Sequence, residues 1–248
     1  MTDKKIHIMD GGMGRELARM GAPFRQPEWS ALALIEGPEY VLQAHKNFID
    51  AGAQIIIPSC YAVIPYHIGQ ERYDASGREL IALSAKLAQQ AVKESGKDVK
   101  IAGCIPPIFG SYFPEKYDEK AAPAIYDAFV EEQAPYIDFW LGETLSSRRE
   151  AVAITDALAR HDNKLPLWLA YCLSEKDPRT LRSGVTLDEI IKLTHEETPA
   201  EALLYNCCAI EDIEDAIIYT RGALPADSKL MLGGYPNSFE NKNQYKQS

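Results

Sequence analysis

The chain has 248 residues, of which 25% are charged and 46% are hydrophobic. This balance is typical of a globular protein and excludes disordered, collagen-like and coiled-coil classes. The 36 acidic and 26 basic side chains give a formal net charge of -10, which argues against nucleic acid and anionic membrane surfaces as partners. We therefore expect small-molecule substrates, no nucleic acid and no membrane.

The cysteine content points to a reducing compartment. A chain of this length does not need disulfides for stability, and its five cysteines are an odd number. The N-terminal residues MTDKKIHIMD lack the apolar segment of a signal peptide. No apolar run approaches the roughly 20 residues that a membrane helix needs. We predict a cytoplasmic protein.

Short apolar runs alternate along the chain with longer segments of helical period. We predict strands at 6–9, 53–57, 99–103, 137–141, 167–172, 202–205 and 230–232. The intervening helices are expected at 38–51, 77–95, 121–135, 146–161, 186–197 and 209–221. This alternation is typical of a parallel sheet with crossover helices.

The spacing of these units favours a barrel. One strand and its helix occupy about 36 residues, the pace of a TIM (β/α)8-type barrel. We predict this α/β fold as a single domain, 1–248, with seven strands visible and the barrel incomplete at the C-terminus. A doubly wound open sheet is the alternative. Polar residues after nearly every strand favour the barrel, whose functional groups come from the carboxyl ends of strands.

Two carboxylates follow predicted strands. Asp10 precedes Gly11 and Gly12, in a segment that either forms a tight turn or lets a ligand approach the backbone. The Asp10 carboxylate either bonds to nearby backbone or binds a ligand amine. Glu143 comes directly after the apolar run IDFWLG, where a buried carboxylate needs a partner. We take Glu143 as the stronger candidate for binding.

Thiols and aromatic rings also lie after predicted strands. Cys207 and Cys208 are adjacent and do not form a CxxC zinc motif, so that one is a candidate ligand and the other a core residue. A buried, inert thiol is the alternative for either. Tyr61 and Tyr235 either bind a cationic methyl donor through their rings or pack with their hydroxyls satisfied.

Five segments together resemble the homocysteine S-methyltransferase family. In chain order they are MDGGMGRELARMGAP, Ser59-Cys60-Tyr61, Gly142-Glu143-Thr144, Tyr205-Asn206-Cys207 and Tyr235-Pro236-Asn237-Ser238. The resemblance covers essentially the whole chain. It implies a barrel enzyme that transfers a methyl group from a sulfonium-type donor, S-methylmethionine or S-adenosylmethionine, to the thiol of homocysteine, giving methionine.

The resemblance also implies a zinc cofactor and roles for individual residues. Cys207 would be a zinc ligand, and the catalytic set would be Cys207, Glu143 and Asp10. Asp10 and Glu143 would bind the substrate ammonium, Tyr61 would face the donor methyl, and Thr144 would position the loop beside Glu143. The implied substrate-binding residues are Asp10, Gly11, Gly12, Tyr61, Glu143, Thr144 and Asn206.

The chain departs from the family pattern in its ligand set. The family's other two zinc cysteines form an adjacent pair in a GGCC motif, which this sequence lacks; Cys60, Cys104 or Cys208 are the candidates to replace them. We expect a shortened form of a barrel of roughly 300 residues, with unpaired strand edges that favour a homo-oligomer. The alternative is a non-catalytic, metal-free barrel that binds an amino acid.

Overall fold

The computed structural model describes residues 6–237, which fall into two compact units. The first unit extends to Cys104 and also includes Asp127–Trp140. The second comprises Ile105–Tyr126 and the residues from Leu141 onward. The helix α6 (Ala122–Gln133) therefore contributes residues to both units.

The strands are parallel and follow chain order. Within residues 6–237 they are β1 (Ile55–Ile56), β2 (Lys100–Ile105), β3 (Phe139–Leu145), β4 (Leu167–Tyr171), β5 (Ala200–Asn206) and β6 (Met231–Tyr235). The strand order is β1-β2-β3-β4-β5-β6, without the reversal that defines a doubly wound sheet. The predicted α/β class with parallel strands is confirmed, and the doubly wound alternative is wrong.

Residues 6–9, predicted as the first strand, do not form one. Only Met9 makes an isolated bridge, to Ile55. The carbonyl of Ile8 accepts hydrogen bonds from Gln54 N and Ile55 N at 2.8 and 3.2 Å. Ile6 and Ile8 are 81% and 57% exposed, so this apolar run contributes backbone pairing and no buried face. Six strands are present in the described residues where seven were predicted.

All six predicted helical segments contain a helix. The corresponding helices are α3 (Pro38–Asp50), α5 (Gln70–Ser95), α6, α7 (Arg148–Arg160), α8 (Leu187–Lys192) and α9 (Ile210–Ala223). Short 3-10 turns occur at Pro114–Lys116 and Ala134–Tyr136, and Leu193–Glu197 is a π-helical turn. Three further helices were not predicted: α1 (Met13–Arg19), α2 (Ser30–Glu36) and α4 (Pro65–Ile68).

The core of the first unit forms where α3 and α5 pack beside the paired strands β1 and β2. Its buried residues are Ile49, Ala53, Ile56, Ala88, Ala91, Val99 and Ile101. Gly103 in β2 permits close packing, because a Cβ atom there would lie 2.4 Å from the Ile137 side chain. Ile137 comes after Ile105–Tyr126 of the second unit in the chain, yet it packs with residues of the first unit that precede this segment.

A buried amide completes the end of β2. Gln133 is 0% exposed; its Nε2 donates to the Cys104 carbonyl at 2.8 Å and its Oε1 accepts from Cys104 N at 3.0 Å. Nε2 also donates to the Phe129 carbonyl, and the Cys60 thiol donates to Oε1. The last turn of α6 therefore satisfies backbone groups that the strand leaves unpaired.

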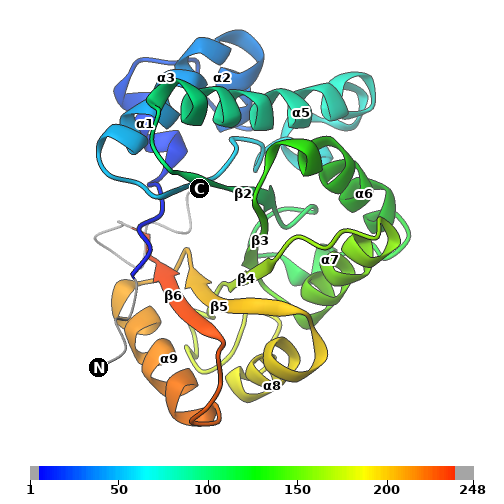
Figure 1. The fold of residues 1–248 in the computed structure, drawn as a ribbon. Helices are drawn as coiled ribbons and strands as arrows, with labels where there is room; N and C mark the ends of the chain where they lie inside the picture. Colours follow the sequence, from blue (N-terminus) through cyan, green and yellow to red (C-terminus); the bar gives the residue numbers. More distant parts are fainter. Residues whose placement is uncertain (1–5, 238–248) are drawn as a thin grey trace. The chain divides into compact units, whose positions relative to one another are not determined.

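In the second unit, β5 pairs in parallel with both β4 and β6 (Figure 1). Tyr171 lies opposite Tyr205, and Asn206 lies opposite Tyr235. The helix α9 packs against β5 and β6, and α8 packs against α9. Because the strands are parallel, the carboxyl ends of β4, β5 and β6 lie at one edge of this part of the sheet.

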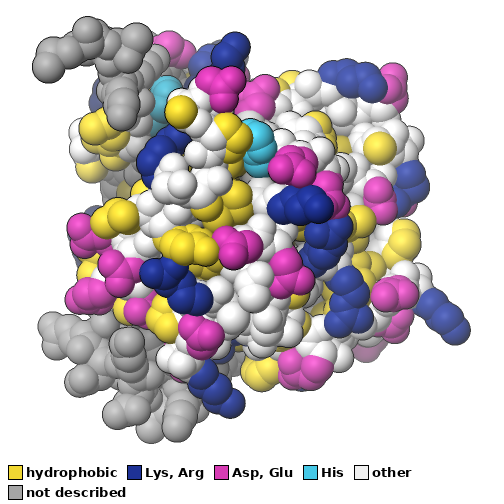
Figure 2. Space-filling view, turned by 90° about the horizontal axis from the view of Figure 1, so that it is seen from below, with side chains coloured by type: hydrophobic (Ala, Val, Ile, Leu, Met, Phe, Trp, Pro, Cys, Tyr) yellow, Lys and Arg dark blue, Asp and Glu magenta, His cyan; other side chains and the backbone are white. Residues whose placement is uncertain are grey.

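None of the helices described between residues 6 and 237 is long and apolar enough to cross a membrane. On the face shown in Figure 2, acidic and basic side chains are interspersed.

Candidate functional site

The second unit brings Glu143 and Tyr235 together at the carboxyl ends of β3 and β6. Glu143 is only 7% exposed, and the Tyr235 hydroxyl donates a hydrogen bond to its Oε1 at 3.1 Å. A buried carboxylate is costly unless it is hydrogen-bonded or paired with a cation. This carboxylate is therefore a suitable partner for a substrate ammonium group.

Asn206 links the end of β5 to the end of β3. Its Oδ1 accepts from Thr144 N at 3.1 Å, and its Nδ2 donates to Thr144 Oγ1 at 2.9 Å and to Cys207 Sγ at 3.4 Å. The Thr144 hydroxyl in turn donates to Cys207 Sγ at 3.6 Å. Three predicted site residues thus form one hydrogen-bonded group.

The backbone at this group is strained. Thr144 and Cys207 both have φ of 55°, and Tyr112 has φ of 73°. Left-handed backbone is unfavourable for residues other than glycine, and most of all for a β-branched residue such as threonine. Such strain persists only where the surroundings impose it, and it is common at functional sites.

Cys207 is partly exposed, yet its sulfur is held as a thiol. Burial of the sulfur, together with the nearby Cys172 and Glu143, raises the pKa of Cys207 to about 12. Hydrogen bonds from Thr144 and Tyr112 oppose this rise in pKa, because they stabilise the thiolate. A cation at this sulfur would remove the thiol proton.

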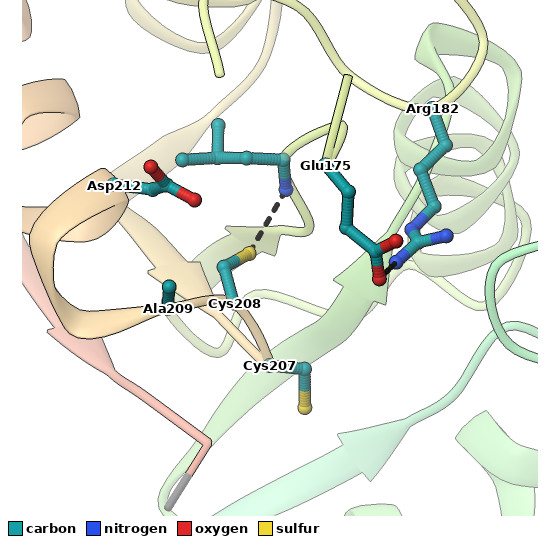
Figure 3. A pocket seen from close by; sticks show the side chains of 7 residues that line it. Glu175, Arg182, Cys207, Cys208, Ala209 and Asp212 are labelled. Atoms are coloured by element: carbon teal, nitrogen blue, oxygen red, sulfur yellow. Dashed lines mark hydrogen bonds and ion pairs between the residues drawn. The ribbon is translucent and has the colours of Figure 1, made fainter. Parts of the chain in front are cut away.

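A small pocket lies behind Cys207, between the segments that follow β4 and β5. It is lined by Leu173, Glu175, Arg182, Cys207, Cys208, Ala209 and Asp212. Its volume of about 10 Å³ is room for one water molecule and not for an amino acid. The Cys207 sulfur points away from Glu175 and Arg182 (Figure 3). We therefore place the candidate substrate site on the side of Thr144 and Glu143.

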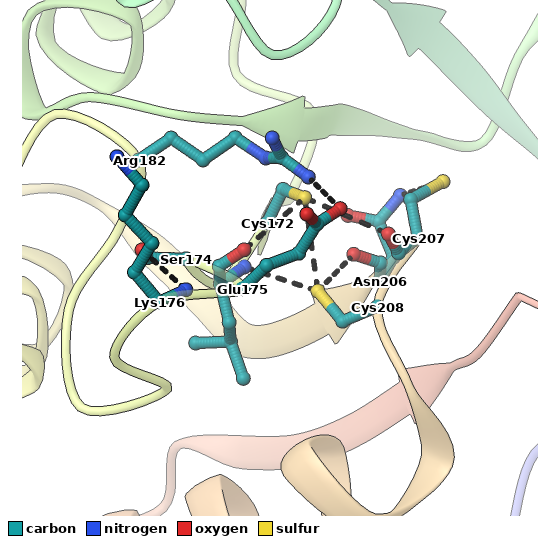
Figure 4. Close-up of polar contacts among 9 residues, drawn as sticks. Cys172, Ser174, Glu175, Lys176, Arg182, Asn206, Cys207 and Cys208 are labelled. Atoms are coloured by element: carbon teal, nitrogen blue, oxygen red, sulfur yellow. Dashed lines mark hydrogen bonds and ion pairs between the residues drawn. The ribbon is translucent and has the colours of Figure 1, made fainter. Parts of the chain in front are cut away.

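Cys208 lies in a different environment from its neighbour. Its sulfur is 3.7 Å from the Cys172 sulfur, accepts from Leu173 N at 3.0 Å and donates to the Asn206 carbonyl. The Cys207 sulfur points away from both of these thiols (Figure 4). Cys208 is thus a core thiol, and the sequence predicted this role for one of the two adjacent cysteines.

The described part of the chain contains no group of three His, Cys, Asp or Glu residues placed to hold a metal ion. Cys208 does not join Cys207 as a second ligand, since the two side chains diverge. Cys60 and Cys104, the other candidates for replacement, belong to the first unit, where Cys60 donates to Gln133.

Sequence reasoning missed two residues beside Cys207. Tyr112 comes from the long segment between β2 and α6, and its hydroxyl hydrogen-bonds to the Cys207 sulfur. Arg182 comes from the segment between β4 and α8; it stacks on the Tyr112 ring at 4.4 Å and pairs with Glu175 at 3.0 Å. Neither residue follows a strand directly, so a search of strand ends does not reach them.

The remaining predicted site residues belong to the first unit. Asp10 Oδ2 accepts a hydrogen bond from Ile57 N at 2.8 Å. This bond joins Asp10 to the segment that follows β1 and does not decide between its two predicted roles. Gly12 precedes α1, and its carbonyl accepts from Arg15 N and Glu16 N. Gly11 packs closely on Phe48, since a Cβ atom there would lie 3.0 Å from the ring. Tyr61 is half-buried after β1.

Solved structures of known proteins share the fold of this chain. The metallated form of the homocysteine methyltransferase MmuM from Escherichia coli matches with a TM-score of 0.79 and 24% identity, over 96% of this chain and 93% of that chain. Its oxidized form matches with a TM-score of 0.78 and 22% identity. These likenesses establish the fold: an α/β, parallel-strand fold shared with a methyltransferase.

The sequence comparisons establish the family. A family model described as homocysteine S-methyltransferase matches residues 7–248. Homocysteine S-methyltransferase 1 of Zea mays is 27% identical over 94% of this chain and 77% of its own length. Homocysteine S-methyltransferase of Escherichia coli K12 is 27% identical over 97% of this chain and 80% of its own length. The chain belongs to the homocysteine S-methyltransferase family, and the predicted class of enzyme is confirmed.

Proposed function

We propose that this enzyme transfers a methyl group from a sulfonium donor, S-methylmethionine or S-adenosylmethionine, to the thiol of homocysteine. The homocysteine sulfur forms a bond to the methyl carbon as the bond from that carbon to the sulfonium sulfur breaks. The donor leaves as a neutral thioether, the thiol proton goes to solvent, and the methylated product is methionine. The reaction needs a well-oriented thiol and a bound amino-acid end.

The observation that carries this proposal is the buried Glu143 carboxylate beside Thr144 and Cys207. Glu143 would bind the homocysteine ammonium through charge-assisted hydrogen bonds. The Tyr235 hydroxyl, 3.1 Å from Glu143 Oε1, would hold the carboxylate in one orientation. A metal-free barrel that only binds an amino acid is less favoured, because the family to which the chain belongs is enzymatic.

We also propose zinc as the cofactor and Cys207 as one of its ligands. Zinc, when bound, would keep the homocysteine sulfur as a thiolate near neutral pH. Hydrogen bonds from Thr144 and Asn206 to Cys207 Sγ suit a thiolate ligand. Cys207 supplies one thiol, and the described residues include no complete set of ligands, so the proposal of zinc rests on the family.

Several predictions from the sequence remain proposals. They comprise binding roles for Asp10, Gly11, Gly12 and Tyr61, a (β/α)8-type barrel forming a single domain over 1–248, small-molecule substrates as the main partners, and self-association. A reducing, cytoplasmic location is consistent with the five free thiols.

The test is an assay of methionine formation by the purified chain. Homocysteine would be supplied with S-methylmethionine, S-adenosylmethionine or betaine in turn, and zinc per chain would be measured on the same sample. We expect methionine with a sulfonium donor and none with betaine. Stoichiometric homocysteine binding without methyl transfer from any donor would instead favour the amino-acid-binding alternative.

A further inference from the structure

The hydrogen-bonding capacity of the Asn206 side chain is almost entirely used within the protein. The residue is 0% exposed. Its amide orientation is fixed because Thr144 N can only donate, so the atom facing it at 3.1 Å must be the carbonyl Oδ1. Nδ2 then faces Thr144 Oγ1 at 2.9 Å and Cys207 Sγ at 3.4 Å.

An amide nitrogen has two hydrogens to donate. Both have an acceptor in the protein, the Thr144 hydroxyl and the Cys207 sulfur. No hydrogen of Asn206 remains for a substrate carboxylate. We propose that Asn206 is a positioning residue and not a substrate-binding one: it holds Thr144 in the left-handed conformation and so sets the direction of the neighbouring Glu143 carboxylate. The proposal rests on the function proposed above.

The end of β3 needs such support. Thr144, with φ of 55°, adopts a conformation that its β-branched side chain disfavours. The two bonds from Asn206 fix both the backbone N–H and the hydroxyl of Thr144. Since Glu143 directly precedes Thr144, release of Thr144 to an extended conformation would turn the carboxylate away from the substrate side.

Glycine offers a direct test, because it adopts positive φ without strain. With Thr144→Gly, the left-handed backbone conformation at position 144 no longer depends on hydrogen bonds from the Asn206 amide. A defect caused by Asn206→Ala should therefore disappear when Thr144→Gly is also present. If Asn206 contacted the substrate itself, the two effects would multiply, as independent losses do.

The experiment compares the wild type, Asn206→Ala, Thr144→Gly and the double variant by calorimetric titration with homocysteine. We expect Asn206→Ala to weaken binding about tenfold, the effect of one or two lost buried hydrogen bonds. Thr144→Gly should weaken binding less than about threefold, and the double variant should match Thr144→Gly within about twofold. A double variant weakened by the product of both factors would overturn the proposal.

A second measurement does not depend on homocysteine. Exchange of the Thr144 backbone amide with deuterium should accelerate about tenfold or more in Asn206→Ala, because its acceptor is lost. Asn206→Asp keeps an acceptor oxygen for that amide and should leave its exchange slow, even if Asn206→Ala does not fold. Unchanged exchange in Asn206→Ala, or fast exchange in Asn206→Asp, would overturn the proposal.

Tyr205→Phe is the matched control. Tyr205 precedes Asn206 in β5, and its buried hydroxyl bonds to Thr220 Oγ1 at 2.7 Å. This variant should lower the unfolding temperature yet leave homocysteine binding and Thr144 exchange unchanged. If the wild type binds no homocysteine, the proposed function fails, and the exchange results still decide the role of Asn206.

Discussion

At the scale of single residues, the site concentrates groups that are unfavourable by themselves. Thr144 and Cys207 carry left-handed backbone, and each such residue costs about 1–3 kcal/mol. Glu143 is a buried carboxylate. Their common neighbours offset these costs: Tyr235 bonds to Glu143, and Asn206 bonds to both Thr144 and Cys207.

The charge of Glu143 should determine homocysteine affinity. Glu143→Gln keeps an acceptor for the Tyr235 hydroxyl but loses the negative charge. Because a hydrogen bond to a charged group contributes about 1.5–3 kcal/mol, KM for homocysteine should rise about 10–100-fold. Steady-state kinetics with varied homocysteine would measure this. Tyr235→Phe, which leaves the charge in place, should raise KM by less than about fivefold; equal effects of the two variants would contradict the assignment.

A buried histidine should make stability depend on pH. His45 in α3 is 0% exposed, and neither ring nitrogen has a hydrogen-bond partner within residues 6–237. Burial lowers the pKa of His45 from 6.5 to about 4. The unfolded chain therefore takes up a proton at a higher pH than the folded chain, so that stability is complete above pH 6.5 and is lost as the pH falls toward 4.

His45→Leu removes this proton uptake. The difference in unfolding free energy between variant and wild type should grow by up to about 3 kcal/mol between pH 7 and pH 4, at about 1.4 kcal/mol for each unit of pKa shift. Urea unfolding at several pH values would measure it. A difference that does not change with pH would show that His45 titrates normally in the folded protein.

At the scale of secondary-structure elements, strand ends are completed by buried amides from elsewhere in the chain. Gln133 bonds to both backbone groups of Cys104, and Asn206 bonds to the backbone N–H and the hydroxyl of Thr144. Gln133→Leu should lower the free energy of unfolding by about 2–5 kcal/mol, because two buried backbone groups lose their partners.

Chemical denaturation would test this prediction against Gln90→Leu. Gln90 is an exposed residue of α5 that bonds to Glu94, and exposed substitutions usually change stability by less than about 0.5 kcal/mol. Similar losses in the two variants would mean that the Cys104 groups find other partners.

Helices with clear end signals were predicted well, and those without them were not. Pro38 and Gly52 bracket α3, which the structure places at Pro38–Asp50. The predicted start of α5 at residue 77 is too late, because the helix begins at Gln70 and Gly77 lies inside it, packed on the Tyr73 ring. The α2 sequence SALALIE lacks a polar face, so it shows no alternation of apolar and polar residues that would indicate a helix.

The site was predictable only where a residue directly follows a strand. Glu143 and Cys207 were named as candidates in this way, and their roles in binding and catalysis stay predictions. The left-handed backbone of Thr144 cannot be predicted from the sequence, since glycine and asparagine are the residues that normally adopt this conformation. Tyr112 reaches Cys207, and Arg182 reaches the Tyr112 ring, from long segments between elements. The placement of both residues depends on tertiary packing that local patterns do not encode.

At the scale of the whole molecule, the net charge of -10 should favour a cationic donor. A negative protein raises the local concentration of cations, and salt screens this attraction. For S-methylmethionine, which carries one net positive charge, kcat/KM should fall roughly two- to tenfold between about 20 mM and 500 mM salt. For homocysteine, a zwitterion, it should change little. Equal salt dependence for both substrates would contradict this account.

The first compact unit is made of two separated parts of the chain, the residues up to Cys104 and Asp127–Trp140. During synthesis, at roughly 5–20 residues per second, the early part leaves the ribosome seconds before Gln133 and Ile137 can join it. Its half-finished interior, including the Cys60 and Cys104 thiols, is exposed for that interval. Newly made chains should therefore depend on chaperones, and on a reducing environment, more than the finished enzyme does.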